Sequence, residues 1–198
     1  MRETELNPQT ITEAIRHRRT VKPKFFDDRS IDESIIQEML TNANWAPTHG
    51  MTEPWRFHVF AGDARKRLAE FLAATYKELT PPEQFKPNKY EGMSQNALLA
   101  QVVIVIGMKR QEIEKISELD ELMAVACAVQ NMHITAASHG VGAFWSTNVA
   151  AVSDQMRDFV GLGPKDRALG LFYLGYPAGD WPAGQRESID SKVQWIRH

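Results

Sequence analysis

The sequence is poor in the features that mark several classes of protein. It contains one cysteine, Cys127, so neither an internal disulfide nor a cysteine-based metal cluster can form. The formal net charge of -2 argues against a basic face able to neutralise many nucleic-acid phosphates. The longest apolar run, 102–108, is far shorter than the roughly 20 residues that cross a bilayer. We therefore expect a cytoplasmic protein without nucleic-acid or membrane partners.

Several motifs of nucleotide, metal and hydrolytic sites are also missing. The pairs Gly140/Gly142 and Gly161/Gly163 lack the remainder of a dinucleotide fingerprint, and there is no P-loop or GxSxG elbow. The histidines show no HExxH or comparable spacing, so we expect no metal site. The apolar surroundings of Cys127 predict a buried, inert thiol.

What is present predicts one domain, residues 1–198, because a chain of this length with 43% hydrophobic residues can bury roughly 70% of its unfolded surface. Helical periodicity, cap residues and β-rich runs place the elements, and their order predicts an α+β layered fold. Helices are expected from a capping box at Thr10–Glu13 to Arg18, from Asp32 to before Pro47, from Asp63 to Tyr76, over 120–139 and after Ser153; strands are expected over 56–61, 102–106, 142–147 and 169–175.

Two segments do not fit this regular pattern. Residues 77–96 carry three prolines and predict a long polar loop of the kind that forms lids and binding segments. The tail from Pro177 onward holds Trp181 and Trp195. An arm that reaches over a partner subunit and a tail folded back on its own domain explain these aromatic residues equally well.

Three groups of residues can carry chemistry. Arg18-Arg19-Thr20 offers a phosphate several donors, although the arginines can equally complement the negative end of the first helix. The stiff loop 45–55 carries polar groups between two prolines and suits either a planar heterocycle or a rigid connection. The run 144–148 ends a strand in hydrogen-bonding side chains. His133, on the long helix, is expected to be a core histidine.

In this order, the three groups resemble the motifs of the nitroreductase family of flavoproteins. The similarity rests on Arg18-Arg19-Thr20, on Ala46-Pro47 with Pro54-Trp55, on the strand 144–147 and on the segment 174–177. It spans nearly the whole chain. It implies a nitroreductase-like fold: a central, mainly antiparallel sheet flanked by helices, a long central helix, and a C-terminal arm exchanged in a homodimer.

The resemblance also implies an enzyme that uses FMN to transfer reducing equivalents from NADH or NADPH to a small organic acceptor, by a ping-pong mechanism. No side chain needs to act as acid or base, because the chemistry takes place on the flavin. The residues implied to bind FMN are Arg18, Arg19, Thr20 and Arg186 at the phosphate, Pro47, Thr48, His49 and Glu53 from the other subunit, and Trp145, Ser146 and Thr147 near the ring or ribityl chain.

The chain departs from the family pattern at Met51 and Glu53, where many members carry Asn and Gln. These changes leave the usual polar contacts to the ring open. An FMN-binding protein for storage, sensing or transfer is the alternative function, because the same contacts serve it. A structural dimer without flavin requires all three groups to be helix ends and turns.

Overall fold

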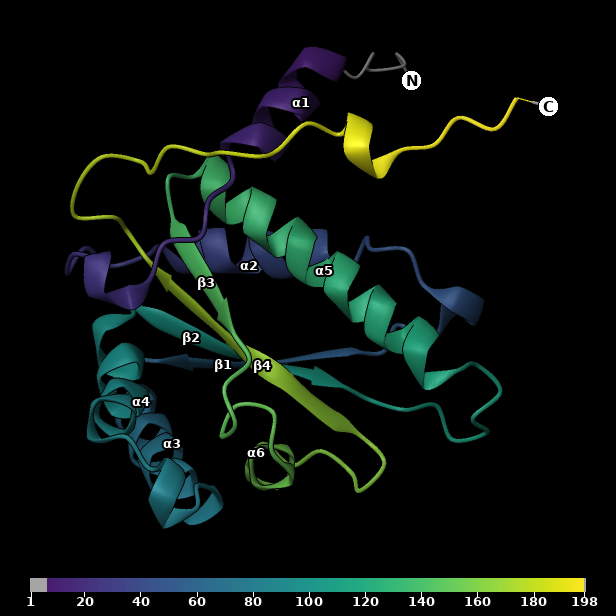
Figure 1. Cartoon of the computed structure of the whole chain (residues 1–198). Helices are drawn as coiled ribbons and strands as arrows, with labels where there is room; N and C mark the ends of the chain where they lie inside the picture. Colours follow the sequence, from purple (N-terminus) through teal and green to yellow (C-terminus); the bar gives the residue numbers. More distant parts are fainter. Residues whose placement is uncertain (1–6, 198) are drawn as a thin grey trace.

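The computed structural model describes residues 7–197 and has a four-stranded antiparallel sheet, in the order β1-β2-β4-β3, between two layers of helices (Figure 1). Every expected strand is present, with ends shifted by at most two residues, and the α+β layered fold is confirmed. The central β2 is buried along its whole length, as its unbroken apolar run indicates. The strands are β1 (Trp55–Ala61), β2 (Val102–Met108), β3 (Gly142–Ser146) and β4 (Arg167–Gly175).

Helices cover both faces of the sheet. One core lies between the sheet and α2 and α5, and it holds Ile104, Ile106 and Phe172. The other lies between the sheet and α3, α4 and α6, and it holds Val103 and Tyr173. Alternate residues of β2 and β4 thus enter opposite cores. The helices are α1 (Pro8–His17), α2 (Glu33–Ala43), α3 (Ala64–Leu79), α4 (Pro87–Leu99), α5 (Glu118–Ser138) and α6 (Asp154–Phe159).

The caps of the helices agree only in part with the sequence pattern. Asp32 accepts a hydrogen bond from the Ser34 amide and Ser153 accepts one from the Met156 amide, as predicted. Asp63 makes no such bond, although α3 follows it. The capping box at Thr10 is wrong: α1 begins earlier, with Asn7 as the cap and Pro8 in the first turn, where its missing amide hydrogen is no loss.

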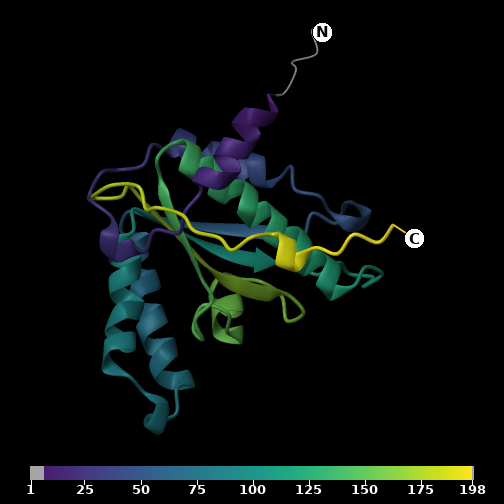
Figure 2. The same ribbon diagram turned by 45° about the horizontal axis from the view of Figure 1, so that its top comes forward.

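The long loop expected over 77–96 is also wrong. Helix α3 continues to Leu79, a short 3-10 turn covers Pro82–Gln84, and α4 begins at Pro87. The prolines lie at the beginnings of the 3-10 turn and of α4, where proline is tolerated because no helical hydrogen bond is lost. They are therefore not evidence for a loop. Helices α3 and α4 form an antiparallel pair that projects from one side of the sheet (Figure 2).

The C-terminal tail begins by folding back on its own domain, which is one of the two paths expected from its sequence. Its first part folds back on α1: the ring of Trp181 stacks on His17 at 5.0 Å, and its Nε1 donates to the His17 carbonyl. From Pro182 to Arg197 every residue is exposed. The tail crosses the molecule beside α1 and α5 (Figure 2). Within residues 7–197, no helix is both long enough and apolar enough to span a membrane.

Candidate functional site

The chain end of α1 and the distant tail meet in a cleft of about 480 Å³, which we call the arginine cleft. Arg18 caps α1, and the chain then bridges to β3 through Thr20, so Arg18 lies beside the middle of α5 at Gln130. The tail brings Arg186 to the same place. The cleft is lined by Ile15, Arg16, Arg18, Arg19, Gln130, Gly184, Gln185 and Arg186.

Positive charge is concentrated in the arginine cleft. The pKa of Arg18 lies below its usual range, first because the group is partly buried, and then because the Arg186 and Arg19 guanidiniums repel its charge. Within residues 7–197, none of these three forms an ion pair with a carboxylate. A bound anion would relieve this repulsion, so the cleft is suited to an anionic group.

The two adjacent arginines have different tasks. Arg19 is occupied by the backbone: its Nε donates to the Pro182 carbonyl at 3.0 Å, and its Nη1 donates to the carbonyls of Arg16 and Arg18. The α-carbon of Gly184 packs so closely on this guanidinium that a Cβ would overlap it. Arg18 makes no side-chain hydrogen bond with the described residues, which leaves its donors for a ligand.

His133 supports the cleft from below. It is 7% exposed on α5, and its Nε2 lies 2.8 Å from the Arg19 carbonyl. Burial lowers its pKa to about 4, against the opposing effect of the hydrogen bonds to the Arg19 and Ala143 backbone, and the charge of Arg18 lowers it further. The expected core histidine is confirmed, and at neutral pH it adds no charge to the cleft.

Thr20 does not face the arginine cleft. It lines a neighbouring cleft of about 760 Å³, together with Lys22, Lys24, Phe25 and the start of the tail. The parallel bridge between Thr20 and Ala143 fixes the backbone there. The expected triplet is therefore divided between two clefts, with Arg18 and Arg19 on one side and Thr20 on the other.

The loop Pro47–Pro54, which we call the proline loop, has an unusual backbone. Gly50, Met51 and Glu53 have φ angles of 61°, 54° and 43°, in the left-handed region. Non-glycine residues there cost on the order of 1–3 kcal/mol each, so surrounding contacts must hold the loop. Inside it, Thr48 Oγ1 accepts from the Glu53 amide at 3.2 Å and lies 3.2 Å from Thr52 Oγ1.

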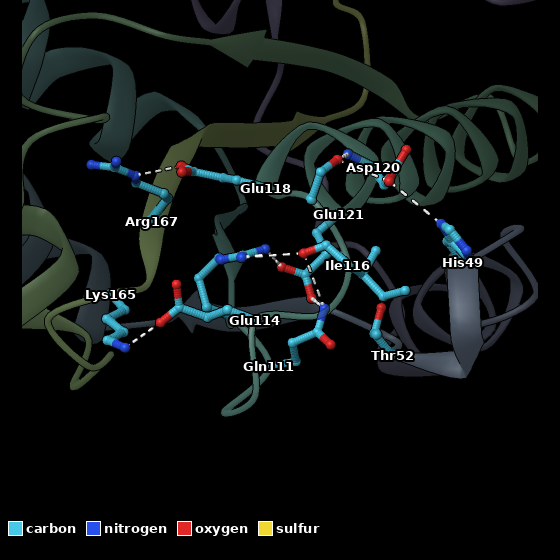
Figure 3. A network of polar contacts seen from close by, with 12 residues as sticks. His49, Thr52, Gln111, Glu114, Ile116, Glu118, Asp120, Glu121, Lys165 and Arg167 are labelled. Atoms are coloured by element: carbon cyan, nitrogen blue, oxygen red, sulfur yellow. Dashed lines mark hydrogen bonds and ion pairs between the residues drawn. The ribbon is translucent and has the colours of Figure 1, made fainter.

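The proline loop lies at the N-terminal end of α5, away from the arginine cleft. His49 Nδ1 is 3.4 Å from Asp120 Oδ2 in the first turn of that helix (Figure 3). Ten helical steps separate Asp120 from Gln130, which is about 15 Å along the axis. Within one protomer, Pro47, Thr48, His49 and Glu53 are therefore not brought together with Arg18 and Arg186.

The end of β3 divides its three polar or aromatic residues. Trp145 faces the α2 and α5 side, and its Nε1 donates to the Leu169 carbonyl at 3.1 Å. Ser146 points to the opposite side, into a cleft of about 450 Å³ that it shares with Lys22 and Asn96. Thr147 is exposed after the strand ends. The alternation of side chains along a strand causes this division.

A model of the nitroreductase family matches residues 15–176. The chain belongs to the nitroreductase family. The match ends before the tail, so Arg186 lies outside it. The family fold that the sequence motifs imply is thereby supported by an independent comparison of the chain.

Individual members of the nitroreductase family agree with this assignment. YdjA of Escherichia coli K12, described as a candidate NAD(P)H nitroreductase, is 28% identical over 143 residues, which are 72% of this chain and 75% of YdjA. A nitroreductase-like family protein from Bacillus cereus has a TM-score of 0.83 and 24% identity, with 98% of this chain and 100% of that chain covered. The FMN-dependent nitroreductase NfnB of Mycobacterium smegmatis, solved with NADPH, has a TM-score of 0.73 and 18% identity, with 96% and 99% covered.

For this nitroreductase family member, the expectation of a buried Cys127 is wrong. Cys127 is exposed, on a face of α5 that also presents Leu119, Leu122 and Met123 to solvent. These residues recur at helical spacing and form an apolar stripe beside the arginine cleft. Apolar residues occur on nearly all faces of the α5 sequence, so periodicity alone does not separate this stripe from the core.

Several polar residues that line the clefts are not among the candidates from the sequence, and Gln130 and Asn96 are two examples. Gln130 lines the arginine cleft and Asn96 lines the cleft below Ser146. Gln130 has a visible signal, because the adjacent amides Gln130 and Asn131 interrupt the apolar stretch of α5. Asn96 has none, since it falls in the stretch expected to be a loop and faces the cleft only because α4 forms.

Proposed function

We propose that this chain is an FMN-dependent oxidoreductase that takes reducing equivalents from NADH or NADPH and passes them to a small organic acceptor. The observation that carries the proposal is the arginine cleft, where guanidiniums without carboxylate partners suit a terminal phosphate. Family membership and the FMN and NADPH of the structurally similar NfnB support the choice of cofactor.

The donor set fits a flavin mononucleotide in two parts. Arg18 and Arg186 bind the phosphate, while Arg19 holds the backbone around it. Thr20 and Ser146 line the adjoining clefts and are proposed to contact the ribityl chain or ring. Thr147 is proposed to lie near the ring at the end of β3, and Trp145 is proposed to approach it from the opposite side of the strand. Bound FMN supplies the two-electron chemistry that protein side chains lack. The side chains bind and orient it, and none of them needs to transfer a proton.

The proposed unit is a homodimer. The proline loop lies at Asp120, about 15 Å along the axis of α5 from Gln130 in the arginine cleft, so it completes the flavin site only from a second copy. The exposed stripe of α5, at Leu119, Leu122 and Met123, gives that copy an apolar surface to cover. Pro47, Thr48, His49 and Glu53 of one subunit then contact the flavin ring of the other.

The exposed end of the tail is proposed as the exchanged arm of this dimer. It carries Ile189, Trp195 and Ile196, which are 65%, 78% and 82% exposed in the protomer. Burial of such apolar side chains against a partner surface would stabilise the dimer, because it removes them from water. Removal of residues 189–198 would therefore weaken the dimer, which sedimentation measurements can detect.

The cleft below Ser146 is proposed as the acceptor pocket. Two ammonium groups, Lys22 and Lys89, line it with Phe144, and no carboxylate is among its lining residues. We expect ping-pong kinetics, because the donor and the acceptor would occupy the same open space in turn. Helix α4 supplies Lys89 and Asn96 to the wall of this pocket.

The charge of the acceptor pocket can be tested with Lys89→Glu. The KM for a carboxylate-bearing nitroaromatic should rise roughly two- to fivefold, the range expected for one exposed charge, and that of an uncharged nitroaromatic should not change. Lys86→Glu, at the residue just before α4 and outside the lining, is the matched control. An equal change in KM for both acceptors would contradict the proposal that Lys89 attracts the acceptor's carboxylate in this pocket.

The whole proposal is tested by the absorption spectrum of the purified protein, followed by anaerobic addition of NADH or NADPH. A flavin spectrum that bleaches with either nucleotide supports the oxidoreductase. A flavin spectrum that does not change indicates storage, sensing or transfer of FMN. Colourless protein without affinity for added FMN would rule out both functions.

A further inference from the structure

A buried ion pair lies beside the proline loop and has no part in the flavin contacts described above. Arg110 pairs with Glu121, and their side chains are 9% and 0% exposed. A buried pair often contributes little net stability, because both charges lose their water. Its hydrogen bonds, however, fix the groups around it.

The pair fixes Ile116, which precedes α5. The Ile116 carbonyl accepts from Arg110 Nη2 at 3.2 Å and from Gln111 Nε2 at 3.3 Å, and the same Gln111 amide lies 3.3 Å from Glu121 Oε1 (Figure 3). Arg110 is held in turn by its own amide, which donates to Asp166 at 2.9 Å. Ile116 is thus tied to the buried pair and, through it, to the start of β4.

Ile116 in turn supports the proline loop. Its side chain packs against the α-carbon of Gly50, so closely that a Cβ there would lie 3.3 Å from Ile116 Cδ1. In the first turn of α5, Asp120 Oδ2 lies 3.4 Å from Nδ1 of His49, a residue of the same loop. The left-handed residues Met51 and Glu53 follow directly, and they are the strained part that needs support.

We propose that Arg110 and Glu121 are positioning residues that hold the proline loop in its left-handed conformation through Ile116. The inference rests on the proposed function for its consequence, the contact of this loop with the flavin ring of the partner. The structural claim itself, that the ion pair holds the proline loop, applies to the protein without bound flavin. The two can therefore be tested separately.

The flavin-independent test is amide hydrogen exchange in peptides covering 48–53, where the amides of Thr52 and Glu53 are hydrogen-bonded. In Arg110→Met/Glu121→Met, which replaces the charges by side chains of similar size, we expect about tenfold faster exchange in these peptides, because local opening becomes easier. Peptides of β2 serve as the internal reference. Unchanged exchange in 48–53 would overturn the inference.

Two further variants separate positioning from general damage. Ile116→Ala leaves the ion pair intact and should reproduce the faster exchange of 48–53. Glu118→Gln removes an exposed ion pair with Arg167 from the same helical turn, and should change it by less than about twofold. If Glu118→Gln speeds the exchange of 48–53 as much as the double variant does, the buried pair acts only by stabilising α5, and the inference is wrong.

The consequence for the flavin is read by titration with FMN and with riboflavin, which lacks the phosphate. A misplaced loop weakens contacts to the ring, so the double variant should lose roughly fivefold affinity for both ligands, about the effect of one hydrogen bond. Loss for FMN alone would contradict the inference. If the wild type binds neither ligand, the proposed function fails, while the exchange experiment still decides whether the loop is held in this way.

Discussion

Two regions along α5 treat charge in opposite ways. At the N-terminal end of the helix, arginines meet carboxylates: Arg110 pairs with Glu121 and Arg167 with Glu118, and the His49 ring lies 3.4 Å from Asp120. Near Gln130, four arginines line the arginine cleft, and among the described residues none of the four forms an ion pair with a carboxylate. The first arrangement satisfies itself, whereas the second stores repulsion that an anionic ligand can relieve.

The difference shows which charges to regard as scaffold and which as binding capacity. Paired groups hold backbone segments in place, as the hydrogen bond from Arg110 to the Ile116 carbonyl illustrates. A partly buried guanidinium such as Arg18, which pairs with no carboxylate among the described residues, is proposed to contribute little to the fold and much to the affinity for an anionic ligand. Sequence alone shows all of these residues as ordinary charges.

The largest expected effect is a loss of folding stability when the buried Arg110–Glu121 pair is broken. Glu121→Gln leaves the Arg110 charge buried without compensation, and we expect the free energy of unfolding to fall by about 3–5 kcal/mol. Urea unfolding at pH 7 measures it. Glu118→Gln, whose ion pair is exposed, is the control and should cost less than about 1 kcal/mol. Equal losses would erase the distinction between the buried and the exposed pair.

The second largest expected effect is the loss of stability when His133, which lies below the arginine cleft, becomes protonated at low pH. Because the pKa of His133 is about 4 when folded and 6.5 in its ordinary state, the unfolded chain takes up the proton first as pH falls. The contribution of neutral His133 is complete above pH 6.5 and is lost between 6.5 and 4, on the order of 3 kcal/mol. Urea unfolding across this range should show a shallower pH slope in His133→Gln. Identical slopes would contradict the assignment.

Removal of the central charge of the arginine cleft comes third. Arg18→Ala should weaken FMN binding by about 1.5–3 kcal/mol, or roughly 10- to 150-fold, because a charge-assisted hydrogen bond is lost. Fluorescence titration measures the affinity. Riboflavin is the control ligand, and its affinity should not change. Retained FMN affinity would refute the phosphate role of Arg18.

Arg186→Ala should have the smallest effect of the four. Arg186 lies in the exposed tail, where a single charge is worth about 1 kcal/mol or less, so FMN affinity should fall by at most roughly fivefold. Arg197→Ala, whose guanidinium lies over the Trp195 ring on the same tail, is the matched control. A loss equal to that of Arg18→Ala would place Arg186 at the centre of the cleft.

Much of the fold could be predicted because its signals are local. The unbroken apolar run of β2 and the cap at Asp32 depend on neighbouring residues only. The stretch 77–96 was misassigned because proline both interrupts helices and begins them. The cap of α1 was ambiguous for a similar reason: the side chains of Asn7 and Thr10 can both accept a hydrogen bond from a backbone amide, so either residue could begin the helix.

The candidate site was less accessible, because its geometry is not local. Arg18 and Arg186 were both named from the resemblance, yet their meeting at Gln130 depends on the path of the tail. The exposure of Cys127 depends on which face of α5 the sheet covers. The buried Arg110–Glu121 pair has no motif and becomes visible only when α5 is docked.

The close packing of Gly184 on Arg19 has a genetic consequence. Carbonyl groups of Arg16, Arg18 and Pro182 hold the guanidinium in place, so it cannot easily give way to a side chain at position 184. Gly184→Ala alone is therefore expected to displace the tail. Arg19→Ala vacates the space that the new methyl group needs and would act as its suppressor, so that the two substitutions together are tolerated better than Gly184→Ala by itself.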